Sequence, residues 1–178
     1  MHKLESDFNF KVMSFIFRLR DLFIPPKDLL KEVGIKTGFR VLDYGCGPGS
    51  YILPLAKLVG NSGKIYALDV HPSAISSVKD SIAKKKLINI ETILSACKTG
   101  LPDNSIDVVL LYDILHELSE PSKVLKELRR ILKPEGIISI SDHHLKEDEI
   151  VPQVTKVGLF RLYQKGKKTY SFLKEEQK

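Results

Sequence analysis

Cysteine is scarce in this sequence, with Cys46 and Cys97 the two examples among 178 residues. The pair forms no CxxC motif, and neither cysteine has a histidine at the spacing of a metal ligand. This pattern excludes a disulfide framework and a structural zinc site of the usual kinds. The low cysteine content also favours a reducing compartment, so we expect a cytoplasmic protein.

Long hydrophobic runs are also missing. No apolar stretch approaches the roughly 20 residues that a membrane-spanning helix needs, so we predict no membrane span. The first ten residues carry Glu5 and Asp7 ahead of any apolar stretch, and no small-residue cleavage site follows, which predicts that no signal peptide is present. Internal repeats and low-complexity segments are absent too, so we expect a single globular unit.

Acidic residues are fewer than basic ones, 22 against 28, and the formal net charge is +6. A positive excess can favour an anionic partner such as RNA. The basic residues are nevertheless scattered, and the densest clusters, within residues 84–86 and 165–168, lie far apart in the sequence. Charge runs of this kind are typical of a solvated surface, so we favour that interpretation over a nucleic-acid groove.

An amphipathic segment precedes the rest of the chain. Residues 8–24 carry an apolar stripe at helical spacing, and Pro25 and Pro26 end the predicted helix. Such a helix packs on the domain, covers a ligand as a lid, or meets a second subunit or a membrane surface. We therefore expect a helical segment, residues 1–34, that packs on or covers the site, followed by the main domain, residues 35–178. A homodimer through the helix is a further expectation.

Strand-like and helix-like segments alternate through the main domain. The predicted strands cover residues 39–43, 64–69, 88–94, 105–113 and 136–142, and the predicted helices cover residues 27–33, 48–60, 72–86, 121–132 and 146–157. Most strand runs are continuously apolar, as expected for a sheet that is covered on both faces. The alternation predicts an α/β fold with a doubly wound, mostly parallel sheet. Residues 159–175 contain two strand-like segments around a glycine, which predicts a C-terminal antiparallel hairpin.

The turn after the first predicted strand, VLDYGCGPGS at residues 41–50, is rich in glycine. A P-loop is excluded because no Lys-Ser/Thr pair follows, and the dinucleotide fingerprint GxGxxG, started at Gly45, fails at Ser50. Pro48 also lacks the backbone N–H that a pyrophosphate would use. Asp43 would repel a pyrophosphate but attract a ligand that is positive near the turn. S-adenosylmethionine, with its ammonium and sulfonium groups, fits this requirement.

On these residues the sequence resembles the class I S-adenosylmethionine-dependent methyltransferases, a Rossmann-like family with three α/β/α layers, over roughly residues 35–175. VLDYGCGPGSY is similar to the first motif of the family, and ALDVHP at residues 67–72 is similar to the second. The resemblance implies S-adenosylmethionine as the cofactor. It further implies that Asp69 accepts the ribose hydroxyls and that Val70 packs on the adenine. The residues implied along the methionine part of the cofactor are Asp43, Gly45, Cys46 and Gly47.

Two later stretches extend the resemblance. Residues 94–118 are similar to the third region and fourth strand of the family, in which an acidic residue followed by alanine often contacts the adenine amine. This chain has Ser95 and Ala96 there, and Ser95 can accept a hydrogen bond but supplies no charge. Asp113 stands where family members commonly contact the methionyl end, with capping of the following helix as the alternative. The stretch LRRILKPEGIISISD implies a helix and a turn before the fifth strand.

Polar side chains that could take part in catalysis follow the fourth and fifth predicted strands. They are Tyr112, Asp113 and His116 after one strand and Asp142, His143 and His144 after the other. We predict His116 and His143 as the catalytic residues, for use where the acceptor must lose a proton. A helix-face histidine with a satisfied hydrogen bond is the alternative for His116.

Two further interpretations concern the same residues. If the strand continued through residues 142–144, adjacent side chains would alternate in direction, so at most one or two of them could face the same pocket. A metal site from His116, His143 and His144 lacks a fixed ligand pattern, so we predict no metal. Cys46 carries a thiol, but we favour its interpretation as a small residue in a tight turn.

These features predict an S-adenosylmethionine-dependent methyltransferase with a small-molecule acceptor. The connections after the fourth and fifth strands are short, so the acceptor site is either shallow or completed by a second subunit. An RNA or protein acceptor is the alternative within enzymes. The sequence LYDILH at the end of strand four nevertheless departs from the Asn-Pro-Pro-aromatic motif of nucleic-acid amine methyltransferases. A non-catalytic subunit that binds the cofactor or a partner is the alternative outside enzymes.

Overall fold

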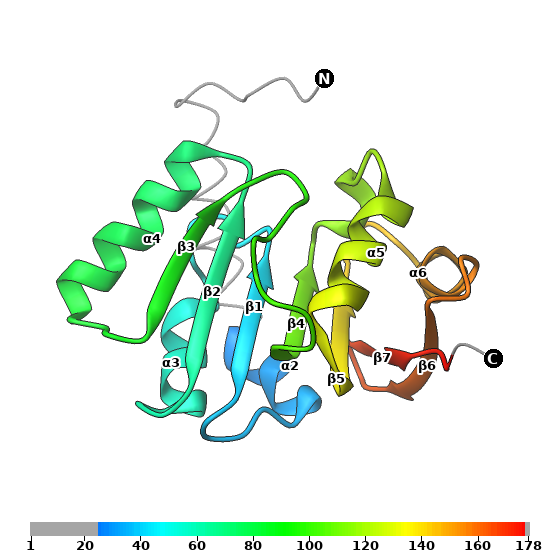
Figure 1. Ribbon diagram of the computed structural model, residues 1–178, viewed down its shortest axis with the longest axis horizontal. Helices are drawn as coiled ribbons and strands as arrows, with labels where there is room; N and C mark the ends of the chain where they lie inside the picture. Colours follow the sequence, from blue (N-terminus) through cyan, green and yellow to red (C-terminus); the bar gives the residue numbers. More distant parts are fainter. Residues whose placement is uncertain (1–24, 177–178) are drawn as a thin grey trace.

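In a computed structural model that describes residues 25–176, seven strands form one sheet in the order β3-β2-β1-β4-β5-β7-β6 (Figure 1). The predicted helix at residues 8–24 lies outside the described residues. The strands are β1 (Arg40–Tyr44), β2 (Lys64–Asp69), β3 (Ile90–Leu94), β4 (Ile106–Tyr112), β5 (Leu132–Ser141), β6 (Phe160–Lys165) and β7 (Tyr170–Lys174). The helices are α2 (Pro26–Val33), α3 (Ile52–Val59), α4 (Pro72–Lys85), η1 (Leu115–Glu117, a 3-10 helix), α5 (Pro121–Ile131) and α6 (Glu147–Thr155).

The strand directions confirm the predicted topology. Strands β1 to β5 pair in parallel, with β1 between β2 and β4, whereas β7 pairs antiparallel to both β5 and β6. The helices between the parallel strands are the crossovers that parallel pairing requires. The predicted C-terminal hairpin is β6–β7, and it occupies the far edge of the sheet (Figure 1).

Two hydrophobic clusters, one on each face of the sheet, make three layers. Alternate residues of β1 divide between them: Leu42 and Tyr44 pack with α5 and α6, while Val41 packs with α2, α3 and α4. Because successive side chains of a strand point to opposite faces, both faces must be apolar for the sheet to be covered twice. Full burial of one Leu or Ile side chain stabilises the fold by about 1.5–3 kcal/mol, so these clusters hold the layers together.

One predicted boundary is wrong. We expected a turn over Lys133 to Glu135 before a strand that begins at Gly136, but β5 begins at Leu132 and directly follows α5. The register between β4 and β5 shifts there, from Ile106 opposite Leu132 to Val108 opposite Ile137. The proline and glycine of the sequence LKPEG belong to this irregularity in the strand, which local turn signals do not distinguish from a true turn.

The sheet places several polar side chains at one edge. The strand order reverses between β1 and β4, and ligands of open α/β sheets bind beyond the carboxyl ends of the strands at such a switch point. The carboxyl ends of β1, β2, β4 and β5 therefore bring the glycine turn, Asp69, Asp113 and Asp142 to the same edge.

None of the helices in residues 25–176 has the length and apolar character of a transmembrane segment.

Candidate active site at the carboxyl edge of the sheet

The glycine turn leaves β1 in a conformation that L-residues rarely adopt. Gly45, Gly47 and Gly49 all have positive φ, at 76°, 50° and 90°. The N–H groups of Gly45 and Cys46 both donate to the carbonyl of Leu68, at 2.8 and 2.9 Å, and so tie the turn to β2. A Cβ on Gly45 would lie 2.8 Å from Cγ1 of Ile114, which follows β4. Glycine at this position therefore allows the turn to pack against the exit of β4.

Asp43 lies beneath this turn as a buried carboxyl group with an unmet hydrogen-bonding requirement. The residue is 2% exposed, and its Oδ2 atom is buried without a hydrogen-bond partner within residues 25–176. Burial, with a further contribution from the charge of Asp69, raises the pKa of Asp43 to about 7. A cationic ligand with N–H donors would supply the missing partner and favour the carboxylate form. The ammonium and sulfonium groups of S-adenosylmethionine fit this arrangement.

Asp69, the last residue of β2, is tied to the turn. Its Oδ2 accepts the N–H of Gly47 at 2.9 Å, and its Oδ1 accepts the N–H of His71 at 2.8 Å. The sequence did not predict the bond to Gly47, because the two residues are 22 positions apart. Each carboxylate oxygen can accept a second hydrogen bond, so the predicted role of Asp69 toward ribose hydroxyls stays a prediction that this geometry allows.

The residues implied around the adenine lie at the end of β2 and β3. Val70 is half-buried directly after Asp69. The N–H of Ser95 donates to the backbone carbonyl of Asp69 at 3.0 Å, and the Tyr44 hydroxyl donates to the carbonyl of Ala96 at 2.9 Å. These bonds place Ser95 and Ala96 next to the ends of β1 and β2, as an adenine site would require.

Two residues with reactive groups are held in the core. Burial raises the pKa of the Cys46 thiol well above its usual range, and the negative charges of Asp43 and Asp69 act in the same direction. The Tyr112 hydroxyl is buried within hydrogen-bonding distance of Ser139 Oγ, at 2.9 Å, and burial raises its pKa too. Both groups therefore stay neutral near pH 7, so neither supplies an anion for catalysis.

Two carboxylate–imidazole pairs stand beyond β4 and β5. Nδ1 of His116 lies 2.8 and 3.0 Å from the two carboxylate oxygens of Asp142, and Nδ1 of His143 lies 2.6 Å from Oδ1 of Asp113. The ring of His144 lies between the other two, with ring centroids 4.3 Å from His116 and 3.9 Å from His143. Each pair joins a residue after β4 to one after β5, which is possible because these strands are neighbours.

This cluster corrects the expected alternation of residues 142–144. We expected them to point to opposite sides if the strand continued, but β5 ends at Ser141 and the chain turns. Consequently the side chains of Asp142, His143 and His144 all join the cluster with His116. In the described part of the chain, no three His, Cys, Asp or Glu side chains are grouped to hold a metal ion.

Asp113 takes part in this cluster through its carboxylate. The N-cap position of η1 is Ile114, without a side-chain cap, while Oδ1 of Asp113 also accepts the N–H of His143 at 3.1 Å. Asp113 has a φ of 53°, a left-handed conformation that costs on the order of 1 kcal/mol for a non-glycine residue. Its N–H donates to the carbonyl of Ser141 at 2.7 Å, which helps to hold the strained turn.

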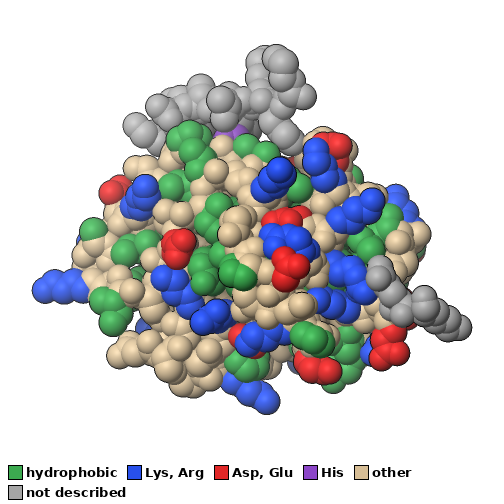
Figure 2. All heavy atoms as spheres, in the orientation of Figure 1, with side chains coloured by type: hydrophobic (Ala, Val, Ile, Leu, Met, Phe, Trp, Pro, Cys, Tyr) green, Lys and Arg blue, Asp and Glu red, His purple; other side chains and the backbone are tan. Residues whose placement is uncertain are grey.

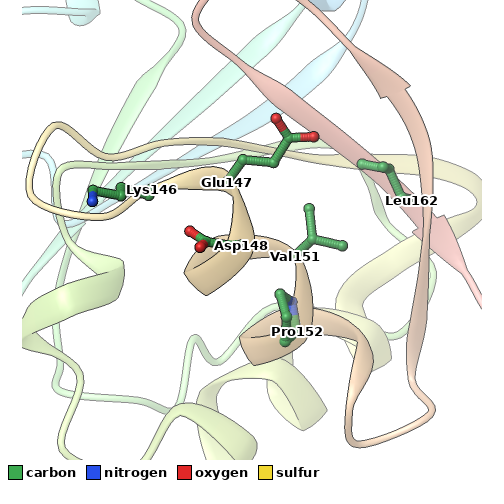
Figure 3. A pocket seen from close by; sticks show the side chains of 6 residues that line it. All are labelled: Lys146, Glu147, Asp148, Val151, Pro152 and Leu162. Atoms are coloured by element: carbon green, nitrogen blue, oxygen red, sulfur yellow. The ribbon is translucent and has the colours of Figure 1, made fainter.

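A separate surface groove of about 650 Å³ lies beside α6 (Figure 3). It is lined by Lys146, Glu147, Asp148, Val151, Pro152 and Leu162. Leu162 belongs to β6, the edge strand, which is three positions from β4 in the sheet. The groove shares no residue with the glycine turn or with the histidine cluster, so it is distinct from the candidate active site.

Comparisons with known proteins agree with this arrangement. A family described as a methyltransferase domain matches residues 35–176. Demethylmenaquinone methyltransferase from Geobacillus stearothermophilus is 32% identical over 112 residues, which are 62% of this chain and 48% of that protein. The ubiquinone/menaquinone biosynthesis C-methyltransferase UbiE from Marinomonas sp. (strain MWYL1) is 27% identical over 135 residues, 75% of this chain and 54% of that protein. The chain thus spans about half the length of the curated relatives it matches.

Solved structures show the same similarity. A SAM-dependent methyltransferase from Aquifex aeolicus has a TM-score of 0.73 and 33% identity, with 84% of this chain and 88% of that chain covered. A structure from Methanococcus maripaludis, described as a putative S-adenosyl-L-methionine-dependent methyltransferase, has a TM-score of 0.79 over 100% of this chain and 98% of that chain. At 16% identity, the second similarity concerns the fold alone.

Proposed function

Since this chain belongs to the methyltransferase-domain family, as a class I S-adenosylmethionine-dependent methyltransferase, we propose that its methyl acceptor is a small quinol and that the methyl group goes to a ring carbon. The acceptor class is supported by the names of two relatives, a demethylmenaquinone methyltransferase and a quinone-biosynthesis C-methyltransferase. Those relatives are about twice as long as the matched segment, so the structure must supply further support.

The cofactor assignment depends chiefly on the unpartnered buried oxygen of Asp43. Gly45, Cys46, Gly47 and Asp113 would hold the methionyl end around it. Asp69 and Val70 would hold the ribose and the adenine, and Ser95 and Ala96 would meet the adenine amine. When bound, S-adenosylmethionine supplies the electrophilic methyl group, and the chain supplies orientation and excludes water.

A small acceptor is supported by the connections around the site. Residues 113–120 join β4 to α5, and residues 142–146 join β5 to α6. Neither segment is long enough to form an extended platform for a macromolecule. On the face shown in Figure 2, basic and acidic side chains are interspersed, whereas a nucleic-acid groove concentrates basic ones.

The proposal is tested with methyl-labelled S-adenosylmethionine and 1,4-dihydroxynaphthalene, kept reduced under nitrogen. We expect equimolar S-adenosylhomocysteine and a product with the label on a ring carbon, identified by mass spectrometry. Label on the oxygen would contradict carbon transfer. Label in added RNA or protein, with none in the quinol, would favour the macromolecular alternative, and cofactor binding without any transfer would favour a non-catalytic subunit.

A further inference from the structure

We propose that His116 is the general base that removes the hydroxyl proton of the acceptor, and that the buried Asp142 orients it. This inference rests on the proposed quinol acceptor and adds the residue that activates it. The sequence predicted both His116 and His143 as catalytic residues. In the structure the two histidines differ in exposure, and His116 is paired with the buried carboxylate of Asp142.

Asp142 determines which nitrogen of His116 carries the proton. Its side chain is 0% exposed and accepts hydrogen bonds from the N–H groups of His116, at 3.2 Å, and His144, at 3.0 Å. An ionised carboxylate can only accept, so Nδ1 of His116, at 2.8 Å, must be the donor. The neutral imidazole then carries its lone pair on Nε2, the form that a general base needs.

The free nitrogen of His116 is accessible. Glu117 Oε1 lies 3.7 Å from Nε2, beyond hydrogen-bonding distance, and Nε2 makes no hydrogen bond to the part of the chain that the structure describes. The His116 side chain is 23% exposed, so Nε2 can meet an acceptor without full exposure to water. Ile114, two residues earlier, would contact a Cβ on Gly45, which places this segment against the cofactor turn.

His143 is less suited to the same task. Its side chain is 58% exposed, and its partner Asp113 is 14% exposed, so water competes for both groups. In the His116 pair the carboxylate is completely buried, and a charge–imidazole interaction is stronger where water is excluded. His144 contributes its N–H to Asp142 and its ring to the stack. We therefore assign the base to His116 alone.

The step balances as a proton transfer coupled to a displacement. The acceptor hydroxyl proton moves to Nε2, and the electron pair released from the O–H bond passes through the ring to the attacking carbon. That carbon bonds to the methyl carbon, and the electron pair of the carbon–sulfur bond leaves on sulfur. Loss of the ring proton to solvent and return of the proton from Nε2 to the oxygen then restore the aromatic quinol, so one proton in total is released. The acceptor class is therefore a phenol or enol, whose nucleophilic form needs this deprotonation.

The test compares the His116→Gln and Asp142→Asn variants with Glu135→Gln, an exposed carboxylate at the opposite end of β5. The first measurement is ring ¹⁵N NMR with labelled histidine in the full chain. We expect the Nδ1–H tautomer for His116 in the wild type and in Glu135→Gln, and a mixture of tautomers in Asp142→Asn. The second measurement is the single-turnover rate with 1,4-dihydroxynaphthalene as a function of pH, together with S-adenosylhomocysteine affinity by calorimetry.

The expected result is a loss of about 100-fold or more in the single-turnover rate of His116→Gln, in the range typical of a general base. S-adenosylhomocysteine affinity should change less than about twofold. The pH dependence of the single-turnover rate in His116→Gln should differ from that of the wild type. Asp142→Asn should lose rate less steeply, because the base remains but its tautomer is no longer held.

Two results would overturn the inference, in distinguishable ways. A wild-type chain that methylates the quinol, with His116→Gln retaining its rate and pH profile, would refute the base while leaving the proposed function intact. A wild-type chain that binds S-adenosylhomocysteine but neither methylates the quinol nor binds 4-nitrocatechol would refute the acceptor class and the base together. Loss of cofactor affinity in His116→Gln would instead assign the residue to binding.

Discussion

The carboxylate of Asp69 accepts the backbone N–H of Gly47 at 2.9 Å and so connects the end of β2 to the middle of the glycine turn. The other oxygen holds His71, at the start of α4, in the same way. Asp69 is therefore a structural support of the turn as well as the predicted ribose contact. These two roles can be tested separately. Support of the turn is needed with or without cofactor, whereas the ribose contact exists only when the cofactor is bound.

The Asp69→Asn variant tests this relationship. An amide has one acceptor oxygen, so it cannot accept both N–H groups in the present geometry. Hydrogen bonds to charged groups contribute about 1.5–3 kcal/mol each, so we expect S-adenosylmethionine affinity to fall by about tenfold or more. Calorimetry measures the affinity, and hydrogen exchange of the Gly47 amide should accelerate without cofactor. Asp80→Asn, an exposed residue of α4, is the matched control, and equal losses in both variants would contradict the assignment.

Asp43 predicts a pH dependence of cofactor binding. Its pKa of about 7 leaves the group largely protonated at pH 6 and ionised at pH 8. A cationic ligand favours the carboxylate, so S-adenosylmethionine affinity should rise across this interval, with proton release near pH 6.5. Calorimetry in two buffers of different ionisation enthalpy counts the protons. Asp43→Asn should bind more weakly at pH 8 and release fewer protons, and an unchanged proton count would refute the role of Asp43.

The same group affects the stability of the ligand-free chain. The folded-state pKa of about 7 lies above the ordinary value of 3.8, so the folded state holds a proton that the unfolded state has lost between these values. The favourable contribution is complete below about pH 4 and is lost as pH rises through 7. We therefore expect ligand-free Asp43→Asn to melt about 3 °C or more above the wild type at pH 8. At pH 4 the two melting temperatures should converge, and a lower value for the variant at pH 8 would contradict the prediction.

Glu127 is expected to stabilise the fold at neutral pH and to lose this effect in acid, the opposite of the pH dependence expected for Asp43. Hydrogen bonds from Arg130, followed by those from Thr99, lower its pKa to about 2. The Thr99 N–H donates to Oε1 at 2.8 Å and Arg130 Nε donates to Oε2 at 2.9 Å. The stability that this carboxylate supplies is present above its ordinary pKa of 4.5 and is lost as pH falls through about 2.

Urea unfolding of the wild type and of Glu127→Gln at pH 7 and pH 3 tests this contribution of Glu127 to stability. At pH 7 we expect a loss of about 1–3 kcal/mol in the free energy of unfolding, because hydrogen bonds to a charged group are removed. The difference from the wild type should be smaller at pH 3. Glu135→Gln, which changes an exposed side chain, should leave both values nearly unchanged. A difference that stays constant with pH would show that packing, and not the charge, is responsible.

Glu32 of α2 connects the start of the described chain to its end. Its Oε2 accepts the N–H of Thr169 at 3.1 Å and the Thr169 hydroxyl at 2.7 Å, in the turn between β6 and β7. Glu32→Ala should lower the free energy of unfolding by about 1–3 kcal/mol and speed hydrogen exchange in the hairpin. Asp28→Asn, on the same helix in an exposed pair with Lys31, should cost about 1 kcal/mol or less. Equal effects would show that α2 as a whole, and not this contact, holds the hairpin.

Most of the fold followed from local patterns. The apolar runs and the alternating helices were enough to predict a doubly wound sheet, because a strand buried on both faces must be apolar throughout. The positive φ of Gly45, Gly47 and Gly49 agrees with the predicted glycine-rich turn, because glycine has no Cβ and adopts this conformation readily. The prediction failed at residues 133–135, where proline and glycine mark a strand irregularity and not a turn. Whether such residues form a turn or an irregular strand depends on the neighbouring strand, here β4, with which they pair. That strand is distant in sequence.

The sequence by itself determined most of the described strands and helices, their order, and the acidic residue two positions before the glycine turn, since each depends on neighbours along the chain. The tertiary structure alone decided that His116 pairs with Asp142 and His143 with Asp113, across separations of 26 and 30 residues. These pairs exist because β4 and β5 are parallel neighbours with aligned carboxyl ends, and because β5 stops at Ser141 so that the residues after it gather in one cluster. Periodicity carries no information on either point, since both depend on the register between strands that are joined by a helix.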